Sequence, residues 1–130
     1  MKIMVCYDGS ESSQEAVKVA MKRAKVSDAK VYVLTSMEKG SEKHQQDIGK
    51  AERELDYVKS VFERDDIPCE SHLLIQGLSP GEDIVKFARE KRIDEIVIGI
   101  EKKSKIGKLF FGSTAQHVIL EAPCPVLAVK

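Results

Sequence analysis

The sequence has no excess of charge of either sign, no long apolar run and few cysteines. Lysine and arginine together number 21, as do aspartate and glutamate, so the formal net charge is zero. A domain that binds duplex nucleic acid normally carries a basic excess, so nucleic acid is not an expected partner. No apolar run approaches the roughly 18 residues of a membrane-spanning helix, and the N-terminus lacks the pattern of a signal peptide. We therefore expect a cytoplasmic protein that makes no membrane contact.

The chain has an odd number of cysteines at wide spacing: Cys6, Cys69 and Cys124. No Cys-x-x-Cys pair or histidine-rich cluster accompanies them, which argues against a metal site, and we expect buried, reduced thiols. The common phosphate-binding fingerprints are also missing. There is no Gly-x-Gly-x-x-Gly, and Gly107-Lys108 is followed by Leu109, where a P-loop requires Ser or Thr.

What the sequence does contain is a regular alternation of apolar runs and amphipathic segments. The apolar runs predict five strands, at residues 2–7, 30–35, 71–75, 95–100 and 126–129. The clearest helical face, with spacings of 3, 4, 3 and 4, is formed by Ile48, Ala51, Leu55, Val58 and Phe62. Serine-led starts predict three more helices, with cap residues Ser12, Ser79 and Ser113 and capping-box partners Glu15 and Glu82 for the first two.

This order predicts an α/β fold with a parallel sheet covered on both faces, in one domain over residues 1–130. In such sheets a ligand binds beyond the carboxyl ends of the strands, where the strand order reverses. Two segments follow strands in this way, residues 8–10 (Asp-Gly-Ser) and residues 99–114. If their strands are neighbours, both segments line one crevice.

The second segment has the parts of an anion site. Gly112 and Ser113 open a helix, whose free N–H groups and positive dipole end favour phosphate. Four lysines precede them: Lys102, Lys103, Lys105 and Lys108. A solvated charged loop before an ordinary serine cap explains the same residues without any ligand. Asp8, likewise, is explained as a residue that only shapes the turn after the strand.

In combination, four segments resemble the universal stress protein family over nearly the whole chain. They are residues 5–10 (VCYDGS), 96–99 (IVIG), 111–115 (FGSTA) and 122–127 (APCPVL). The resemblance implies a Rossmann-like fold of the adenine nucleotide alpha-hydrolase type. Its five-stranded parallel sheet has the order 3-2-1-4-5, with four helices in three layers.

Nucleotide-binding members of the family carry G-x2-G-x9-G-[ST]. Gly99, Gly112 and Ser113 match this motif, but Lys102 stands where the second glycine belongs. The lysine either blocks close approach of a phosphate or supplies charge in place of N–H contacts.

The resemblance also implies a ligand, ATP or another adenine nucleotide with or without Mg²⁺, and a homodimer paired through the fifth strand. Asp8 would contact the adenosine part of the nucleotide. The base pocket would be lined by Cys6, Tyr7, Thr35 and Ser36. The ribose and phosphates would be held by Gly99, Lys102, Gly112, Ser113 and Thr114.

Three functions compete at this point. The first is a nucleotide-dependent sensor or switch in stress adaptation, read by unknown protein partners. The second is a dimeric scaffold of the same fold that binds no nucleotide, which the missing glycine at position 102 favours. The third is an enzyme, which we do not expect, because no general base and no Ser/His/Asp or Cys/His constellation can be assembled.

Overall fold

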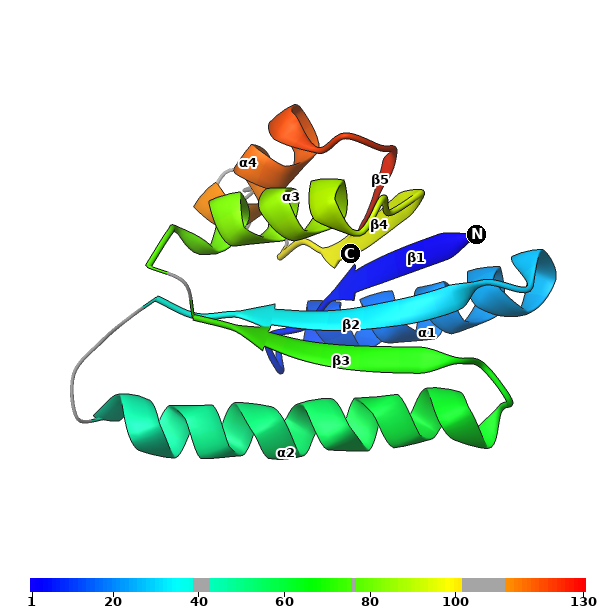
Figure 1. The fold of residues 1–130 in the computed structure, drawn as a ribbon, viewed down its shortest axis with the longest axis horizontal. Helices are drawn as coiled ribbons and strands as arrows, with labels where there is room; N and C mark the ends of the chain where they lie inside the picture. The colour runs from blue at the N-terminus through cyan, green and yellow to red at the C-terminus, as the bar shows by residue number, and fades with distance from the viewer. Residues whose placement is uncertain (39–42, 76, 102–111) are drawn as a thin grey trace.

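The computed structural model describes residues 1–38, 43–75, 77–101 and 112–130. Within them, strands and helices alternate along the chain as β1 (Lys2–Cys6), α1 (Glu11–Ser27), β2 (Lys30–Ser36), α2 (Lys43–Arg64), β3 (Cys69–Leu74), α3 (Pro80–Glu90), β4 (Glu95–Gly99), α4 (Ser113–Glu121) and β5 (Val126–Val129) (Figure 1). All strand pairs are parallel and the sheet order is β3-β2-β1-β4-β5. The expected α/β fold with order 3-2-1-4-5 is therefore confirmed.

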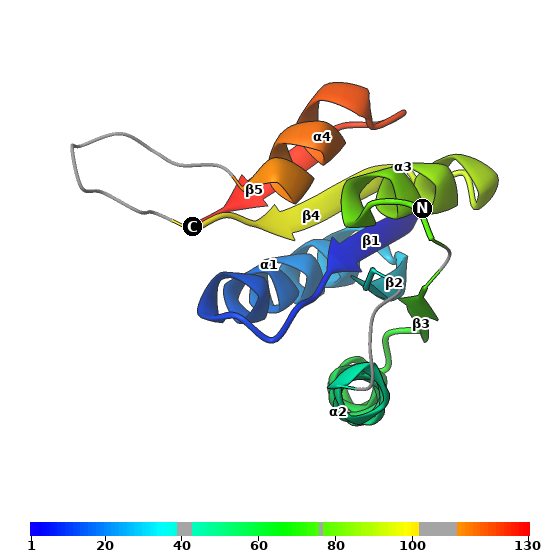
Figure 2. The ribbon, with the colours of Figure 1, turned by 90° about the vertical axis from the view of Figure 1, so that its left-hand side faces the viewer.

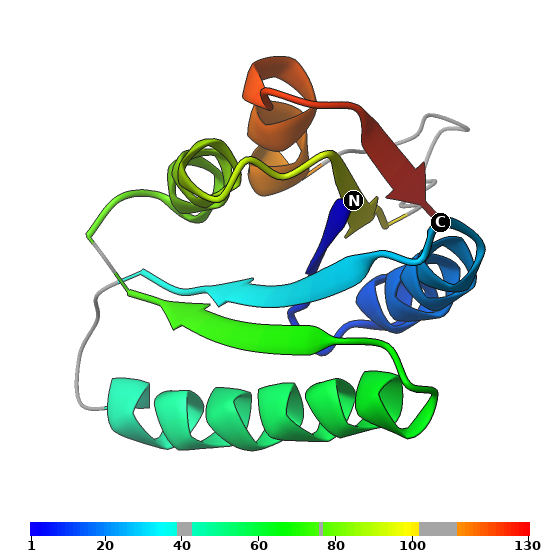
Figure 3. The ribbon, with the colours of Figure 1, turned by 45° about the vertical axis from the view of Figure 1, so that its right-hand side comes forward.

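Two hydrophobic cores lie on opposite faces of the sheet. On β1, Ile3 and Val5 belong to the core under α1 and α2, whereas Met4 and Cys6 belong to the core under α3 and α4. Figure 3 shows α2 beneath the sheet and α3 and α4 above it. Because both faces are covered, the strand has no polar face, which explains its uninterrupted apolar run.

Helix α2 uses only part of its predicted apolar face. Leu55, Val58 and Phe62 are buried, but Ile48 and Ala51, nearer the start of the helix, are only half-buried. The helix ends at Arg64, and the amide of Ile67 donates a hydrogen bond to the carbonyl of Phe62 at 3.1 Å. The periodicity thus predicted the helix correctly, although the sheet covers only its second half.

The first and last helices begin differently from the prediction. Helix α1 starts at Glu11, and its N-cap is Ser10, whose Oγ accepts a hydrogen bond from the Ser13 amide at 3.2 Å. The expected cap at Ser12 is wrong, because Gly9 turns the chain with a φ of +84° and the helix forms sooner. Ser113 does begin α4, but the N-cap is Gly112.

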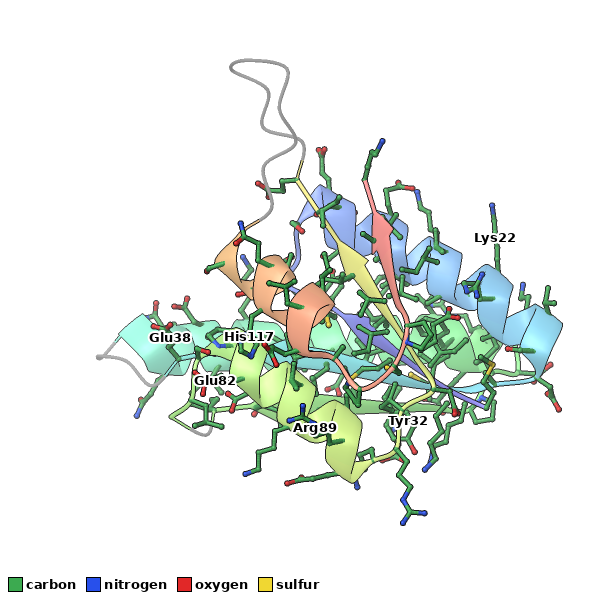
Figure 4. All side chains as sticks on the ribbon, turned by 90° about the horizontal axis from the view of Figure 1, so that it is seen from above. Lys22, Tyr32, Glu38, Glu82, Arg89 and His117 are labelled. Atoms are coloured by element: carbon green, nitrogen blue, oxygen red, sulfur yellow. The ribbon has the colours of Figure 1, made fainter. Side chains whose placement is uncertain are left out.

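Helices α3 and α4 lie side by side over the same face of the sheet (Figure 4). A Cβ on Gly81 would lie 2.9 Å from the Cβ of His117, so glycine allows the close approach of the two helices. His117 is therefore half-buried against α3 rather than free on the surface. This contact fixes the first turn of α3 relative to α4.

An ion pair joins the carboxyl-terminal part of helix α1 to the start of β4. Glu95 opens β4 and is only 7% exposed, and both of its oxygens accept hydrogen bonds from Arg23, with Nη2 to Oε2 at 2.7 Å. A carboxylate removed from water is costly unless it is paired and hydrogen-bonded in this way. The pair sets the position of α1 along β4.

At its other end, α1 lies directly against the last residue of β4. A Cβ on Gly99 would lie 2.4 Å from the carbonyl carbon of Ser12 and 2.7 Å from the amide nitrogen of Ser13. Both are backbone atoms, which cannot rotate away as the end of a side chain can. Any side chain at position 99 must therefore push α1 away from β4.

We predict that Gly99→Ala lowers the free energy of unfolding by about 3 kcal/mol, the upper end of ordinary overpacking costs, because it forces backbone apart. Gly112→Ala is the matched control: no atom of the described residues lies within 4 Å of its Cβ position, and its φ is −62°. That change should cost about 1 kcal/mol or less, the preference of an N-cap for glycine over alanine. Urea denaturation measures both, and equal small losses would contradict the steric role of Gly99.

Candidate functional site

A cavity of about 410 Å³ opens at the carboxyl ends of β1, β2 and β4, the edge that faces the viewer in Figure 2. In parallel βα units each helix begins near the end of the preceding strand, so the first turns of α1, α3 and α4 also border the cavity. Its size is within the usual range for small-molecule sites. The expected crevice between residues 8–10 and the segment after β4 is therefore present.

The lining of the cavity is apolar on the sheet and polar at the helix starts. The apolar side chains come from β1, β2, α3 and β4 with the residue after it: Cys6, Leu34, Ile84, Ile98 and Ile100. The hydroxyl groups at the starts of α1 and α4 belong to Ser10, Ser12, Ser13, Ser113 and Thr114. Such a cavity suits a ligand that has both an apolar part and a strongly polar part.

Eight of the ten predicted site residues line this cavity: Cys6, Tyr7, Asp8, Ser36, Gly99, Gly112, Ser113 and Thr114. Thr35 is not among the lining residues. Its side chain is buried, and its Oγ1 donates a hydrogen bond to the carbonyl of Tyr7 at 2.7 Å, which ties the ends of β1 and β2 together. Lys102 lies outside the described residues.

Cys6 and Tyr7 face opposite sides of the sheet. Cys6 lies in the core under α3 and α4, and burial, with a smaller effect from Asp8, raises the pKa of its thiol to about 12. The thiol is therefore protonated at neutral pH and is not an activated nucleophile. Tyr7 packs against the core under α1 and α2, and burial, followed by the charge of Glu54, raises its pKa.

Asp8 is held as a fixed carboxylate at the mouth of the cavity. Its Oδ1 accepts a hydrogen bond from the Ser10 amide at 2.9 Å. Burial acts to raise the pKa of Asp8, but hydrogen bonds from Ser10 and Ser13 outweigh it and hold the pKa below its ordinary value of 3.8. The group is thus an oriented acceptor at neutral pH, suited to ligand hydroxyls.

The three helix starts at the cavity differ in how they are capped. Ser10 caps α1, and Ser79 caps α3 by accepting from the Glu82 amide at 3.4 Å. Helix α4 begins after Gly112, which has no side chain, and no cap from the described residues replaces it. A helix start of this kind can receive a ligand, and an anion is the ligand that its N–H groups and the helix dipole favour.

Asp83, in the first turn of α3, is a polar residue at this site that the sequence did not reveal. It is 1% exposed, and its Oδ2 accepts a hydrogen bond from the Ser36 Oγ at 3.1 Å. Its Oδ1 is buried and has no partner within the described part of the chain. An acidic residue in a first helical turn is ordinarily a surface group that complements the dipole, so its sequence position gave no signal.

The described residues contain neither a metal-binding cluster nor a helix that could span a membrane. No group of three or more His, Cys, Asp or Glu side chains lies close enough together to hold a metal ion. No helix in the same part of the chain is both long and apolar enough to cross a membrane.

Comparison with known proteins identifies the class to which this fold and cavity belong. A model of the universal stress protein family matches residues 1–130, and the chain belongs to that family. It is 35% identical over 140 residues to a universal stress protein of Methanocaldococcus jannaschii, covering 99% of this chain and 81% of that protein.

Two solved structures from Archaeoglobus fulgidus are similar in both fold and sequence. One universal stress protein has a TM-score of 0.89 and 38% identity, with 100% of this chain and 98% of the other covered. The second, solved in complex with dAMP, has a TM-score of 0.84 and 34% identity at the same coverage.

The Asp8 carboxyl should titrate below 3.8 in the folded protein. Because its folded pKa is depressed, its charge adds stability that is present above the unfolded pKa and is lost as pH falls through the folded pKa. Ser10→Ala should raise the pKa because it removes the hydrogen bond from the Ser10 side chain, while the bond from the Ser10 amide remains. Carbon-13 NMR titration of the side chain measures both values, and an unchanged pKa in the variant would contradict this account.

Proposed function

We propose that this protein binds an adenine nucleotide in the cavity at the strand ends and acts as a nucleotide-dependent sensor or switch in the stress response. The observation that carries the proposal is one cavity that combines an apolar wall, a fixed carboxylate and an uncapped helix start. The dAMP complex of the Archaeoglobus relative, at 34% identity, supports it.

The polarity of the cavity suggests how the nucleotide lies. The base would rest against Cys6, Leu34 and Ile84, since it is the least polar part of the ligand. Asp8 would accept hydrogen bonds from ribose hydroxyls. The first phosphate would meet the N–H groups and hydroxyls of Ser113 and Thr114 at the start of α4.

ATP, with or without Mg²⁺, is our choice among adenine nucleotides because four lysines precede this helix in the sequence. Positive charge near the outer phosphates favours the more highly charged ligand. We propose binding without efficient turnover. Among the described residues, the cavity lining holds carboxylates at Asp8 and Glu101 but no histidine, and Asp8 is a poor base because its pKa is low.

The second candidate is a scaffold of the same fold that binds no nucleotide, favoured by Lys102 in place of the motif glycine. Calorimetric titration of the nucleotide-free protein with Mg-ATP separates the two. Binding in the micromolar range would support the switch. An absence of heat up to millimolar ATP would favour the scaffold.

Gly112→Val should block the phosphates without blocking the nucleoside. Within the described part of the chain nothing lies within 4 Å of the Gly112 Cβ position, and its φ of −62° is accessible to valine, so the fold should survive. We expect at least a tenfold loss of ATP affinity, about 1.4 kcal/mol, because the added methyls occupy the approach to α4. Adenosine, which has no phosphate, is the matched ligand and should bind the variant nearly as well as the wild type. Unchanged ATP affinity would exclude this phosphate site.

We further propose that two copies pair through β5, which lies at the edge of the sheet (Figure 3). The carbonyl of Pro125 accepts a hydrogen bond from Ile96 of β4 at 3.0 Å, and that of Val129 accepts one from Ile100, just after β4, at 2.7 Å. By the alternation of a parallel ladder, the N–H groups of Val126 and Ala128 point outward. Leu120, on the helix that precedes β5, is 79% exposed, and an unpaired sheet edge favours pairing.

Ala128→Pro removes one outward N–H and should convert the dimer to a monomer, because an edge strand tolerates proline but then cannot donate there. Light scattering after size exclusion measures the mass. Val26→Asp on α1, at a residue 91% exposed in the monomer, is the matched surface change and should leave the mass unchanged. A monomeric wild type, or a dimeric proline variant, would refute pairing through β5.

A further inference from the structure

A buried carboxylate stands behind the cavity wall where β2 ends. Asp83 is 1% exposed, lies in the first turn of α3, and accepts a hydrogen bond from the Ser36 hydroxyl at 3.1 Å. Ser36 itself lines the cavity. At this point the cavity is lined by Ser36 of β2, and Asp83 of α3 lies behind it.

Ser36 occupies the apolar part of the cavity. It lies two residues beyond Leu34 on the same face of β2, and Leu34 is paired with Cys6 in the sheet. On the other side of the pair, Ile84 follows Asp83 and lines the cavity. A flat base resting against Cys6, Leu34 and Ile84 would therefore bring an edge toward the Ser36 hydroxyl.

The hydrogen bond to Asp83 decides which role that hydroxyl plays. A serine hydroxyl has one proton and two lone pairs, and here the proton is directed at Asp83 Oδ2. Asp83 Oδ1 has no partner among the described residues. Because the serine proton is directed at Asp83, the Ser36 oxygen that lines the cavity is presented as a hydrogen-bond acceptor.

We propose that the Ser36–Asp83 pair selects a 6-aminopurine over a 6-oxopurine. The amino group of adenine donates to the Ser36 oxygen, whereas the carbonyl of hypoxanthine or guanine places an acceptor against an acceptor. Leaving polar atoms unpaired in this way discriminates more strongly than a change of apolar contact does. Ser36 touches the base and Asp83 is a positioning residue that holds its proton away. The inference rests on the proposed nucleotide site.

The test compares AMP with inosine monophosphate, which carries a 6-oxo group, by calorimetry on the nucleotide-free protein. The wild type should bind AMP at least about tenfold more tightly, the ratio expected for one mismatched hydrogen-bond partner. Ser36→Ala removes the acceptor and should bring the ratio close to one. Asp83→Asn supplies an amide that can donate to Ser36, which frees the serine proton for a 6-oxo group and should also lower the ratio.

Ser12→Ala is the matched control, since it removes another hydroxyl that lines the cavity, in the first turn of α1. It should change both affinities together and keep the wild-type ratio. Circular dichroism shows whether each variant is folded. If Asp83→Asn, at a buried position, fails to fold, the Ser36→Ala variant still tests the proposal.

The outcomes separate this inference from the proposed function. If the wild type binds neither nucleotide, both are overturned. If it binds AMP and inosine monophosphate equally, or if Ser36→Ala or a folded Asp83→Asn keeps the wild-type ratio, only the selection by this pair is overturned.

Discussion

The contact between the end of β4 and the first turn of α1 is the constraint on which the cavity depends. A Cβ at Gly99 would come within 2.4 Å of the Ser12 backbone, so the two segments touch without any side chain between them. At the other end of β4, Arg23 of α1 is paired with Glu95. With α1 held at both ends, its first turn is placed beside β1 and forms one wall of the cavity.

This contact separates the two motif glycines by physical role. Gly99 is required by packing, because α1 occupies the space a side chain would take. Gly112 has no neighbour among residues 1–38, 43–75, 77–101 and 112–130 within 4 Å of its Cβ position, and its backbone conformation is open to other residues. Packing against the described residues gives no reason for glycine there, which leaves the preference of an N-cap for glycine and the room for a ligand to approach the backbone. The two glycines belong to one phosphate-binding motif, but Gly99 is required for folding, whereas Gly112 leaves space at the start of α4.

The fold could be predicted because its signals are local and repeated. Apolar runs such as residues 3–6 require two covered faces, and the helix at Leu55, Val58 and Phe62 follows from periodicity alone. The first residue of a helix was harder to predict, since several neighbouring serines could serve as the N-cap of α1. The turn at Gly9 makes Ser10 the cap. Strand order came from the family resemblance, because pairing between distant segments leaves little local trace.

The candidate site was predictable where a motif marked it and not where tertiary contact created it. Asp8 and Gly112 follow strands and open helices, so their sequence positions suffice. Thr35 and Ser36 are adjacent, yet the alternation of β2 sends Thr35 to the Tyr7 carbonyl and Ser36 to the cavity. Asp83 meets Ser36 across 47 residues of chain, a contact that no local pattern encodes.

Two sets of polar groups that lack hydrogen-bond partners among the described residues border the same cavity. Within that part of the chain, helix α4 begins without a side-chain cap and Asp83 keeps a buried oxygen without a partner. Unpaired buried groups and bare helix ends are both unfavourable, so a ligand that pairs with them gains free energy. The start of α4 offers N–H donors, and Asp83 fixes the Ser36 oxygen as an acceptor, with β1 between them. A ligand anionic at one end and hydrogen-bond-donating at the other satisfies both, which is the polarity of an adenine nucleotide.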